Sequence, residues 1–163
     1  GAPGEAGCRA PRTSNLAAMT TDTTTPPAEP GGSNLGKTAA LVGILGGAGA
    51  MHFVNPQFFD PIVPKWMPGT ARTVTYVSGV VELVAAALVL NPKTRRLGAL
   101  VSLLTFVGVW PANIQAALDG GMKGLDPPMD SAAAAWIRVP FQLPLIFLAY
   151  QLAQSVTSRE SAV

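Results

Sequence analysis

Four long apolar runs restrict what this chain can fold into. They lie at residues 35–54, 73–90, 97–118 and 131–156, and they carry almost no charge. A helix needs about 20 residues to cross a hydrocarbon core about 30 Å thick, and each run approaches or exceeds that length. Buried helices of soluble proteins are usually shorter. The pattern therefore predicts an all-α polytopic membrane protein, a bundle of four transmembrane helices.

The composition agrees with a membrane protein and excludes several other classes. Only 12% of the 163 residues are charged, about half of what a soluble domain contains. The net charge is +2, and no stripe of Lys and Arg is interleaved with aromatic residues, so we expect no nucleic-acid partner. With one cysteine and one histidine, the chain lacks the ligands of a Cys-based or multi-His metal site, so we expect no metal.

The polar and apolar parts of the chain predict its domain organisation. Residues 1–34 are rich in Thr, Pro, Gly and Ser and are expected to form a disordered tail. Within that tail, Met19 opens a stretch typical of a natural start, which predicts that residues 1–18 are an extension outside the native chain. The membrane domain is predicted at residues 35–156, and residues 157–163 form a short C-terminal tail.

The distribution of Lys and Arg predicts the orientation of the bundle. One side would hold the larger set, Lys37, Lys93, Arg95, Arg96 and Arg159. The other side would hold Lys65, Arg72 and Lys123. Because cytoplasmic loops carry an excess of Lys and Arg, both chain ends are predicted to be cytoplasmic.

The loop after the first apolar run, "VNPQFFDPIVPKWMPGTAR", combines four prolines with aromatic and aliphatic residues. The prolines prevent a long helix, and the apolar side chains favour contact with the membrane or the protein. Two interpretations stay open for this segment. It could anchor the protein at the membrane interface, or it could form a lid over the outer mouth of the bundle.

Polar side chains inside the apolar runs gather at one depth. With a rise of about 1.5 Å per residue, Glu82 lies roughly 15 Å and Arg138 roughly 10 Å from the outer ends of their helices. His52, Asn113 and Gln142 fall in the same outer half. These five residues form the predicted polar cluster, either a ligand pocket or a structural cluster. Its supporting residues are Ser78, Asn55, Pro111 and Pro140.

Glu82 and Arg138 are the charged members of this cluster. A charge at the centre of a membrane helix costs about 2.5–3.5 kcal/mol on insertion scales, so two unpaired charges would strain a small bundle. Their opposite signs and similar depths predict an ion pair, formed directly or through one amide or water, with Asn113 beside it. The inner halves of the helices contain nothing comparable.

Prolines and glycines predict how the helices bend and pack. Pro111 and Pro140 each remove a backbone donor, which bends a helix and frees a carbonyl group. Such bends are tolerated where they face protein or a wet cavity. Gly43 and Gly47 form a GxxxG motif, which suits close packing of the first helix against a neighbour.

Four motifs in order, "HFVNPQFFDPIVPKWMP", "VSGVVELVAAALVL", "VWPANIQ" and "RVPFQLPLI", resemble the DoxX-like four-helix membrane proteins of bacteria. The resemblance covers residues 36–155 and implies a location in the bacterial inner membrane. Some members of that family take part in quinone-linked sulfur oxidation or in membrane redox assemblies, which makes a quinone a candidate cofactor. This chain lacks the paired cysteines that a thiol–quinone mechanism would need.

Several functions remain open at this stage. The polar cluster could bind a small molecule, such as a quinone or a lipid head group, or serve a membrane redox assembly. Alternatively, the cluster could be purely structural and fix helix packing within a larger complex. An isomerase or oxidoreductase using Glu82 and His52, or a proton-coupled transporter, is a further alternative, so enzymatic activity stays undecided. The expected partners are the lipid bilayer, other membrane redox or transport subunits, and a second copy of the chain.

Overall fold

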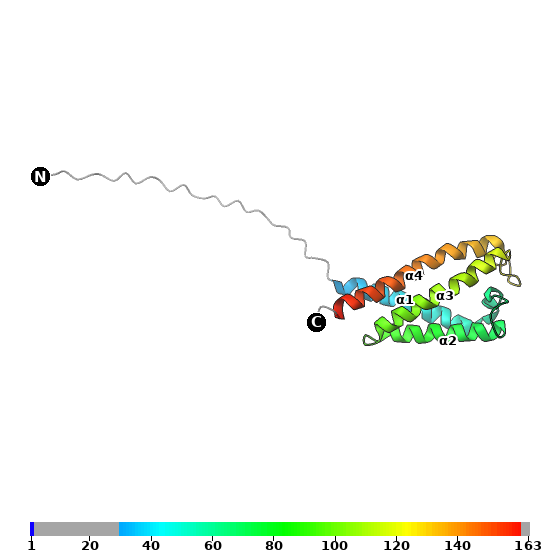
Figure 1. Cartoon of the computed structure of the whole chain (residues 1–163), viewed down its shortest axis with the longest axis horizontal. Coiled ribbons are helices and arrows are strands. Elements are labelled where there is room, and N and C mark those ends of the chain that lie inside the picture. The colour runs from blue at the N-terminus through cyan, green and yellow to red at the C-terminus, as the bar shows by residue number, and fades with distance from the viewer. Residues whose placement is uncertain (2–29, 161–163) are drawn as a thin grey trace.

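Every regular element of the described chain is a helix, as the apolar runs predicted. The computed structural model describes Gly1 and residues 30–160, and Figure 1 shows its course. In order, the elements are α1 (Pro30–Val54), the short 3-10 helices η1 (Pro56–Phe58) and η2 (Asp60–Ile62), α2 (Ala71–Leu90), α3 (Arg95–Leu118) and α4 (Ala132–Glu160). The all-α fold class is confirmed.

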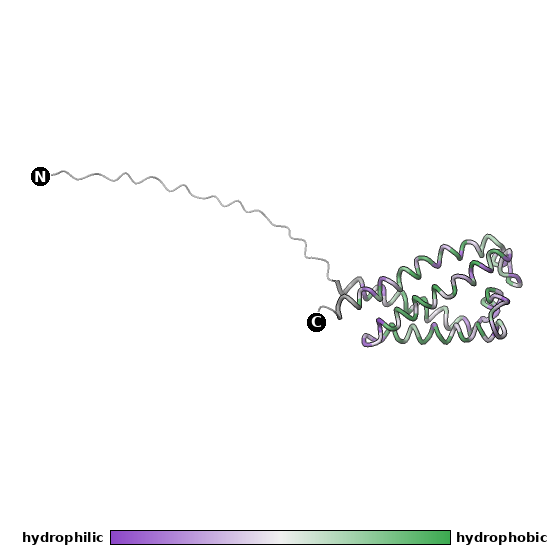
Figure 2. Tube along the Cα trace, in the orientation of Figure 1, coloured by the Kyte–Doolittle hydropathy of each residue, from purple (hydrophilic) through white to green (hydrophobic). Residues whose placement is uncertain are grey.

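The four α-helices are long and apolar enough to cross a membrane. The candidate spans are Asn34–Val54, Ala71–Leu90, Arg95–Leu118 and Ala132–Val156. Figure 2 shows hydrophobic residues along the helices and hydrophilic residues in the connections between them. The length and composition of these helices indicate a multi-pass membrane protein.

The helix ends differ slightly from the predicted domain boundaries. α1 begins at Pro30, inside the predicted N-terminal tail, and α4 continues to Glu160, inside the predicted C-terminal one. The proposed extension at residues 1–18 lies outside the described residues except for Gly1, and residues 161–163 lie outside them too.

The helices pack as two pairs that diverge toward one end of the molecule. α1 packs most extensively on α2, and α3 on α4, whereas the contact between α1 and α4 is limited. Figure 1 shows the pairs close together near the α2–α3 turn and apart near η1 and η2. We call these the turn end and the lid end of the bundle.

The turn end holds the main apolar core. Its buried side chains come from all four helices: Leu41, Leu45, Ala85, Ala86, Val89, Ala99, Phe106, Ala149, Leu152 and Ala153. In the turn, the Thr94 hydroxyl donates to the Leu88 carbonyl at 2.9 Å, and Arg95 Nε donates to the Val89 carbonyl at 3.0 Å. These bonds satisfy carbonyl groups at the C-terminal end of α2 that have no helical partner.

A close crossing of α1 and α2 depends on Gly49 and Gly79. A Cβ atom at position 79 would lie 2.7 Å from the His52 Cβ, so only glycine fits there at this helix separation. The GxxxG motif predicted to pack closely does not do so, because a Cβ at Gly43 or Gly47 would meet nothing within 4 Å. The reason is rotational: Gly43 and Gly47 lie on an exposed face of α1, away from α2.

The loop between α1 and α2 folds back over the lid end. Asp60 of η2 forms an ion pair with Arg72 at 2.8 Å and accepts a hydrogen bond from the Thr75 hydroxyl at 2.7 Å. Ile62 is buried against Ala116 of α3 and other apolar side chains of the lid end. Burial by itself would raise the pKa of the Asp60 carboxyl, but the hydrogen bonds from Arg72 and Thr75 hold that pKa below its ordinary value. This arrangement favours the lid interpretation of the loop.

Two hydrogen bonds join α3 to α4 near the helix prolines. Trp110 Nε1 donates to the Val139 carbonyl at 3.0 Å, and Gln142 Nε2 donates to the Phe106 carbonyl at 2.8 Å. Pro111 and Pro140 lie inside helices that continue through them.

Candidate functional site

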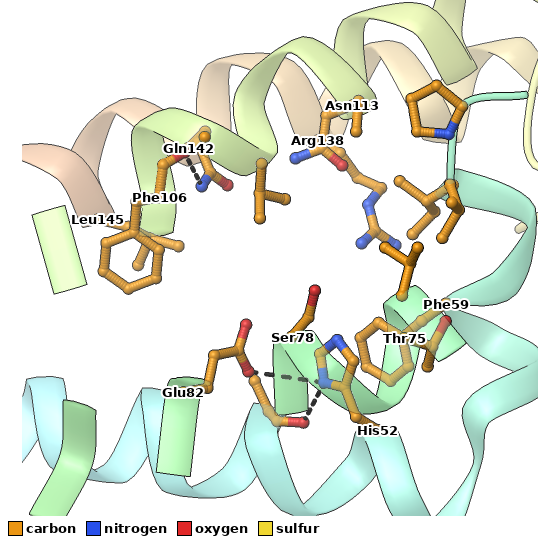
Figure 3. Close-up of a pocket in the computed structure, with 18 of the residues that line it drawn as sticks. His52, Phe59, Thr75, Ser78, Glu82, Phe106, Asn113, Arg138, Gln142 and Leu145 are labelled. Carbon is orange, nitrogen blue, oxygen red and sulfur yellow. Dashed lines mark hydrogen bonds and ion pairs between the residues drawn. The ribbon is translucent and has the colours of Figure 1, made fainter. Parts of the chain in front are cut away.

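A cavity of about 220 Å³ lies between the two helix pairs at the lid end. The loop covers it with Phe59, Ile62, Val63, Pro64 and Met67, and most of the wall is apolar. Six of the residues singled out in the sequence line this one cavity: His52, Ser78, Glu82, Asn113, Arg138 and Gln142. In Figure 3, His52, Ser78 and Glu82 form one wall, and Asn113, Arg138 and Gln142 form the wall opposite.

His52 and Glu82 lie side by side on the first wall. Nδ1 of His52 lies 2.8 Å from the Ala48 carbonyl oxygen, so this nitrogen carries a proton and donates it there. The same nitrogen is 3.6 Å from Glu82 Oε2, beyond the usual hydrogen-bond distance. The His52 ring also stacks on Phe59 of the loop, with 3.7 Å between ring centroids. The close crossing at Gly79 is what brings His52 and Glu82 together.

Glu82 is the least satisfied polar group of the cavity. Its side chain is 10% exposed, and Oε2 is buried without a hydrogen-bond partner. A buried carboxyl oxygen that lacks a partner costs free energy, so such a group calls for an explanation. Oε2 is the oxygen on the His52 side, whereas the other oxygen of the Glu82 carboxyl group points toward the cavity (Figure 3) and is available to a molecule that enters.

The direct ion pair predicted between Glu82 and Arg138 is wrong. Among the described residues, the basic side chain within 4 Å of the Glu82 carboxyl group is His52, and the Arg138 guanidinium contacts other groups. Asn113 shares the cavity but bridges neither charge with a hydrogen bond. The residues of the predicted polar cluster do line one cavity, but the divergence of the helix pairs places the two charges on opposite walls (Figure 3).

Arg138 contacts one residue from the α3–α4 connection and one from the α1–α2 loop, both through weak interactions. Its Nη1 lies 3.5 Å from the sulfur of Met122, and its guanidinium carbon lies 5.4 Å from the ring centroid of Phe58. Sulfur is a weak acceptor, and a cation over an aromatic ring retains its hydrogen-bond donors. Arg138 therefore keeps donors for a ligand in the cavity.

The remaining predicted residues divide between the cavity and its surroundings. Asn113 is 5% exposed and lines the cavity, as does Gln142, whose amide nitrogen is bonded to Phe106 of α3. Asn55 does not line it but faces a second hollow beside Phe58 and Asp126. Pro111 and Pro140 belong to the helix backbones near the cavity rather than to its lining.

Sequence reasoning did not assign site roles to Phe59, Thr75, Phe106 and Met122. Phe59, Thr75 and Phe106 line the cavity, and Met122 is fully buried beside Arg138. Apolar residues of this kind are typical of any membrane helix or loop, so no signal separates them in the sequence. Thr75 could have been found, because it shares a helical face with Ser78 and Glu82.

The polar groups of the cavity can donate and accept hydrogen bonds. Across residues 30–160, no group of three or more His, Cys, Asp and Glu side chains could hold a metal ion. The cavity instead combines an apolar wall, a histidine–carboxyl pair and a guanidinium group.

Comparison with known proteins identifies a family without an assigned activity. No curated protein and no solved structure matches the chain. The resemblance to DoxX-like proteins stays a prediction. A family model matches residues 41–153, which run from α1 to α4 and include every residue predicted for the polar cluster. The protein therefore belongs to the family described as a domain of unknown function, DUF8561.

Proposed function

We propose that this protein binds a small, mainly apolar molecule in the cavity at the lid end, with a quinone or a lipid head group as the leading candidates. The observation that carries the proposal is the buried Glu82 carboxyl oxygen without a partner. In the same proposal, the protein lies in the inner membrane of a bacterium as a DoxX-like component of a membrane redox assembly. Both chain ends are then cytoplasmic, and the cavity lies in the outer half of the bilayer.

The energetic cost of the charged groups supports a binding role. Ionisable side chains inside membrane helices are expensive and are retained where they serve a function. Here Glu82 lacks a hydrogen bond at Oε2, and Arg138 contacts a sulfur atom and the face of an aromatic ring. A purely structural pair would be expected to satisfy both charges, because half-satisfied buried networks destabilise a fold.

The position of the cavity favours a ligand that dissolves in lipid. The lid covers the cavity with apolar side chains, whereas Ile44 of α1 and Gly108 of α3 line it and are also exposed on the bundle surface. Between the helix pairs, the limited contact of α1 with α4 leaves a less tightly packed seam. A molecule that partitions into the bilayer can approach the cavity from this side.

A structural role is the second candidate, and two contacts favour it. Gln142 donates to the Phe106 carbonyl, and His52 donates to the Ala48 carbonyl, so part of the polar cluster is satisfied inside the protein. Such bonds between and within helices can fix packing without any ligand.

Mass spectrometry of co-purifying molecules separates the two candidates. The full chain is isolated with its surrounding lipid, and the extract is compared with bulk membrane for enriched quinones and lipids. Two variants serve as a matched pair. Ala112→Phe fills the cavity, because Ala112 lines it, whereas Ala87→Phe places the same ring on the exposed face of α2.

If the cavity binds a ligand, we expect one compound to be enriched with the wild type and with Ala87→Phe. The amount of this compound should be several-fold lower with Ala112→Phe. Identical extracts from all three proteins, each with the composition of bulk membrane, would favour the structural role. Size-exclusion chromatography checks that each protein is folded, so that a lower amount of the compound reflects an empty cavity and not an unfolded protein.

A further inference from the structure

The two walls of the cavity offer different hydrogen-bond partners, and this difference restricts the ligand. His52 and Glu82 lie on the wall formed by α1 and α2, and Arg138 lies on the wall formed by α3 and α4 (Figure 3). The cavity volume of about 220 Å³ is below the 300 to 1,000 Å³ of typical ligand sites, so a compact molecule or head group is expected.

The wall with His52 and Glu82 always presents acceptors. The Nδ1 proton of His52 is directed at the Ala48 carbonyl, so in the neutral ring the other nitrogen, Nε2, carries a lone pair. Figure 3 shows this second nitrogen on the side of the cavity. The Glu82 oxygen that does not face His52 points toward the cavity, and a carboxyl group keeps an acceptor oxygen whether or not it is protonated.

One proton shared between His52 and Glu82 would also make this wall a donor. If the imidazole is charged, Nε2 donates, and if the carboxyl group is protonated, its hydroxyl donates. A ligand group that binds in every one of these states must be able to donate, because a neutral imidazole beside an ionised carboxyl group offers acceptors alone. A hydroxyl group can donate, whereas a carbonyl or an ether oxygen only accepts.

The opposite wall donates in every state. The Arg138 guanidinium carries five N–H donors and no acceptor, and it stays protonated. Its contacts with Met122 and Phe58 use little of that capacity. One amide hydrogen of Gln142 is already bonded to Phe106, and Asn113 adds a neutral amide, so the charged guanidinium is the strongest donor on this wall. The matching ligand group is an acceptor oxygen such as a carbonyl.

We propose that the ligand is a compact apolar molecule with a hydroxyl group at His52 and Glu82 and an acceptor oxygen at Arg138. This inference rests on the proposed binding function and names its ligand class. Hydroxyphenyl carbonyl compounds and the reduced, hydroquinone form of a quinone belong to this class. An oxidised quinone does not, because it presents a carbonyl oxygen at both ends.

Binding of matched benzoate esters to the purified full chain tests the hydroxyl directly. Propyl 4-hydroxybenzoate carries the hydroxyl and the ester carbonyl, and propyl benzoate differs only by lacking the hydroxyl. We expect the hydroxyl ester to bind the wild type about tenfold more tightly, the effect of one hydrogen bond to a charged or buried polar group. The Ala112→Phe variant measures partition of each ester into the detergent, which is subtracted.

Two variants test which wall causes the tighter binding of the hydroxyl ester. Glu82→Met removes both carboxyl oxygens at similar volume, and we expect the preference for the hydroxyl ester to fall to about threefold or less. Arg138→Met should weaken both esters by the same factor and leave the preference unchanged, because both carry the carbonyl group.

The outcomes distinguish this inference from the function on which it rests. Equal binding of the two esters to the wild type, lost in Ala112→Phe, would overturn the hydroxyl inference and leave the cavity as a binding site. Absence of binding by either ester would also overturn it, while the extraction experiment still decides whether the cavity holds a natural ligand. The wild-type comparison does not use Glu82→Met, so it stands even if that variant fails to fold.

Discussion

The turn end and the lid end of the bundle differ in how their interiors are filled. At the turn end, Leu45, Val89 and Leu152 are fully buried in a continuous apolar core. At the lid end, the helix pairs diverge, and the space between them is a cavity that contains both a carboxyl group and a guanidinium group. Packing at the turn end stabilises the bundle. The lid end holds a carboxyl group and a guanidinium group that this packing does not require.

This difference indicates that the residues that stabilise the bundle and the residues of the candidate site lie at opposite ends of the helices. Membrane helices associate through close packing and hydrogen bonds, since lipid supplies little hydrophobic driving force. The core at the turn end supplies the packing. The cavity at the lid end can therefore hold a partly unsatisfied carboxyl group without unfolding the protein.

The largest expected effect contrasts a leucine inside the core with a leucine at the border between core and cavity. Leu45→Ala empties a fully buried position of the core and should lower the free energy of unfolding by about 2 kcal/mol or more. Leu145→Ala, at a half-buried position that lines the cavity, should cost clearly less, because space already exists beside it. Unfolding in mixed micelles, followed by circular dichroism, measures both. Equal losses would show that the cavity wall at Leu145 is packed as tightly as the core around Leu45.

The next effect tests the crossing that supports the lid end. Gly79→Ala should destabilise the protein by about 1–3 kcal/mol, because the new methyl group meets His52 and Phe53. Gly43→Ala should stay within about 0.5 kcal/mol, since its methyl group enters open space on the bundle surface. The same unfolding measurement applies. A large loss for Gly43→Ala would mean that this face packs against something, such as a second copy of the chain.

A smaller effect concerns how the charges of the cavity are coupled. In double-mutant cycles of unfolding free energy, Glu82→Gln with His52→Phe should show a coupling of at least about 0.5 kcal/mol, as for residues in contact. Glu82→Gln with Arg138→Gln should be additive within about 0.5 kcal/mol, because the two charges lie on opposite walls. The reverse ranking would restore the pair between Glu82 and Arg138.

The smallest effect is the pH dependence of the lid contact. The folded-state pKa of Asp60 is depressed, so its contribution to stability is present above the unfolded pKa of about 3.9 and is lost as the pH falls through the folded value. Asp60→Asn lacks this titration. We expect the melting temperature of the wild type to fall more than that of the variant below about pH 4. Parallel curves for the two proteins would remove Asp60 from the acid transition.

Much of this protein could be predicted from local features of its sequence. The four spans were predicted because uncharged runs of sufficient length leave few alternatives in a membrane protein. His52, Glu82, Asn113, Arg138 and Gln142 could be assigned to one end, because the rise of a helix converts sequence position into depth. The lid was one of two interpretations that the proline-rich loop allowed.

Only the tertiary structure decided which of these groups meet. Sequence position determines depth, but contact also depends on how each helix is rotated and on how far the helix pairs diverge. The close crossing at Gly79 pairs Glu82 with His52 rather than with Arg138, and the exposed Gly43 and Gly47 have no such role. The fold class and the end of the bundle that holds the polar cluster thus follow from the sequence alone. The cavity and its two unlike walls follow from packing, because contacts between helices are set by the whole bundle.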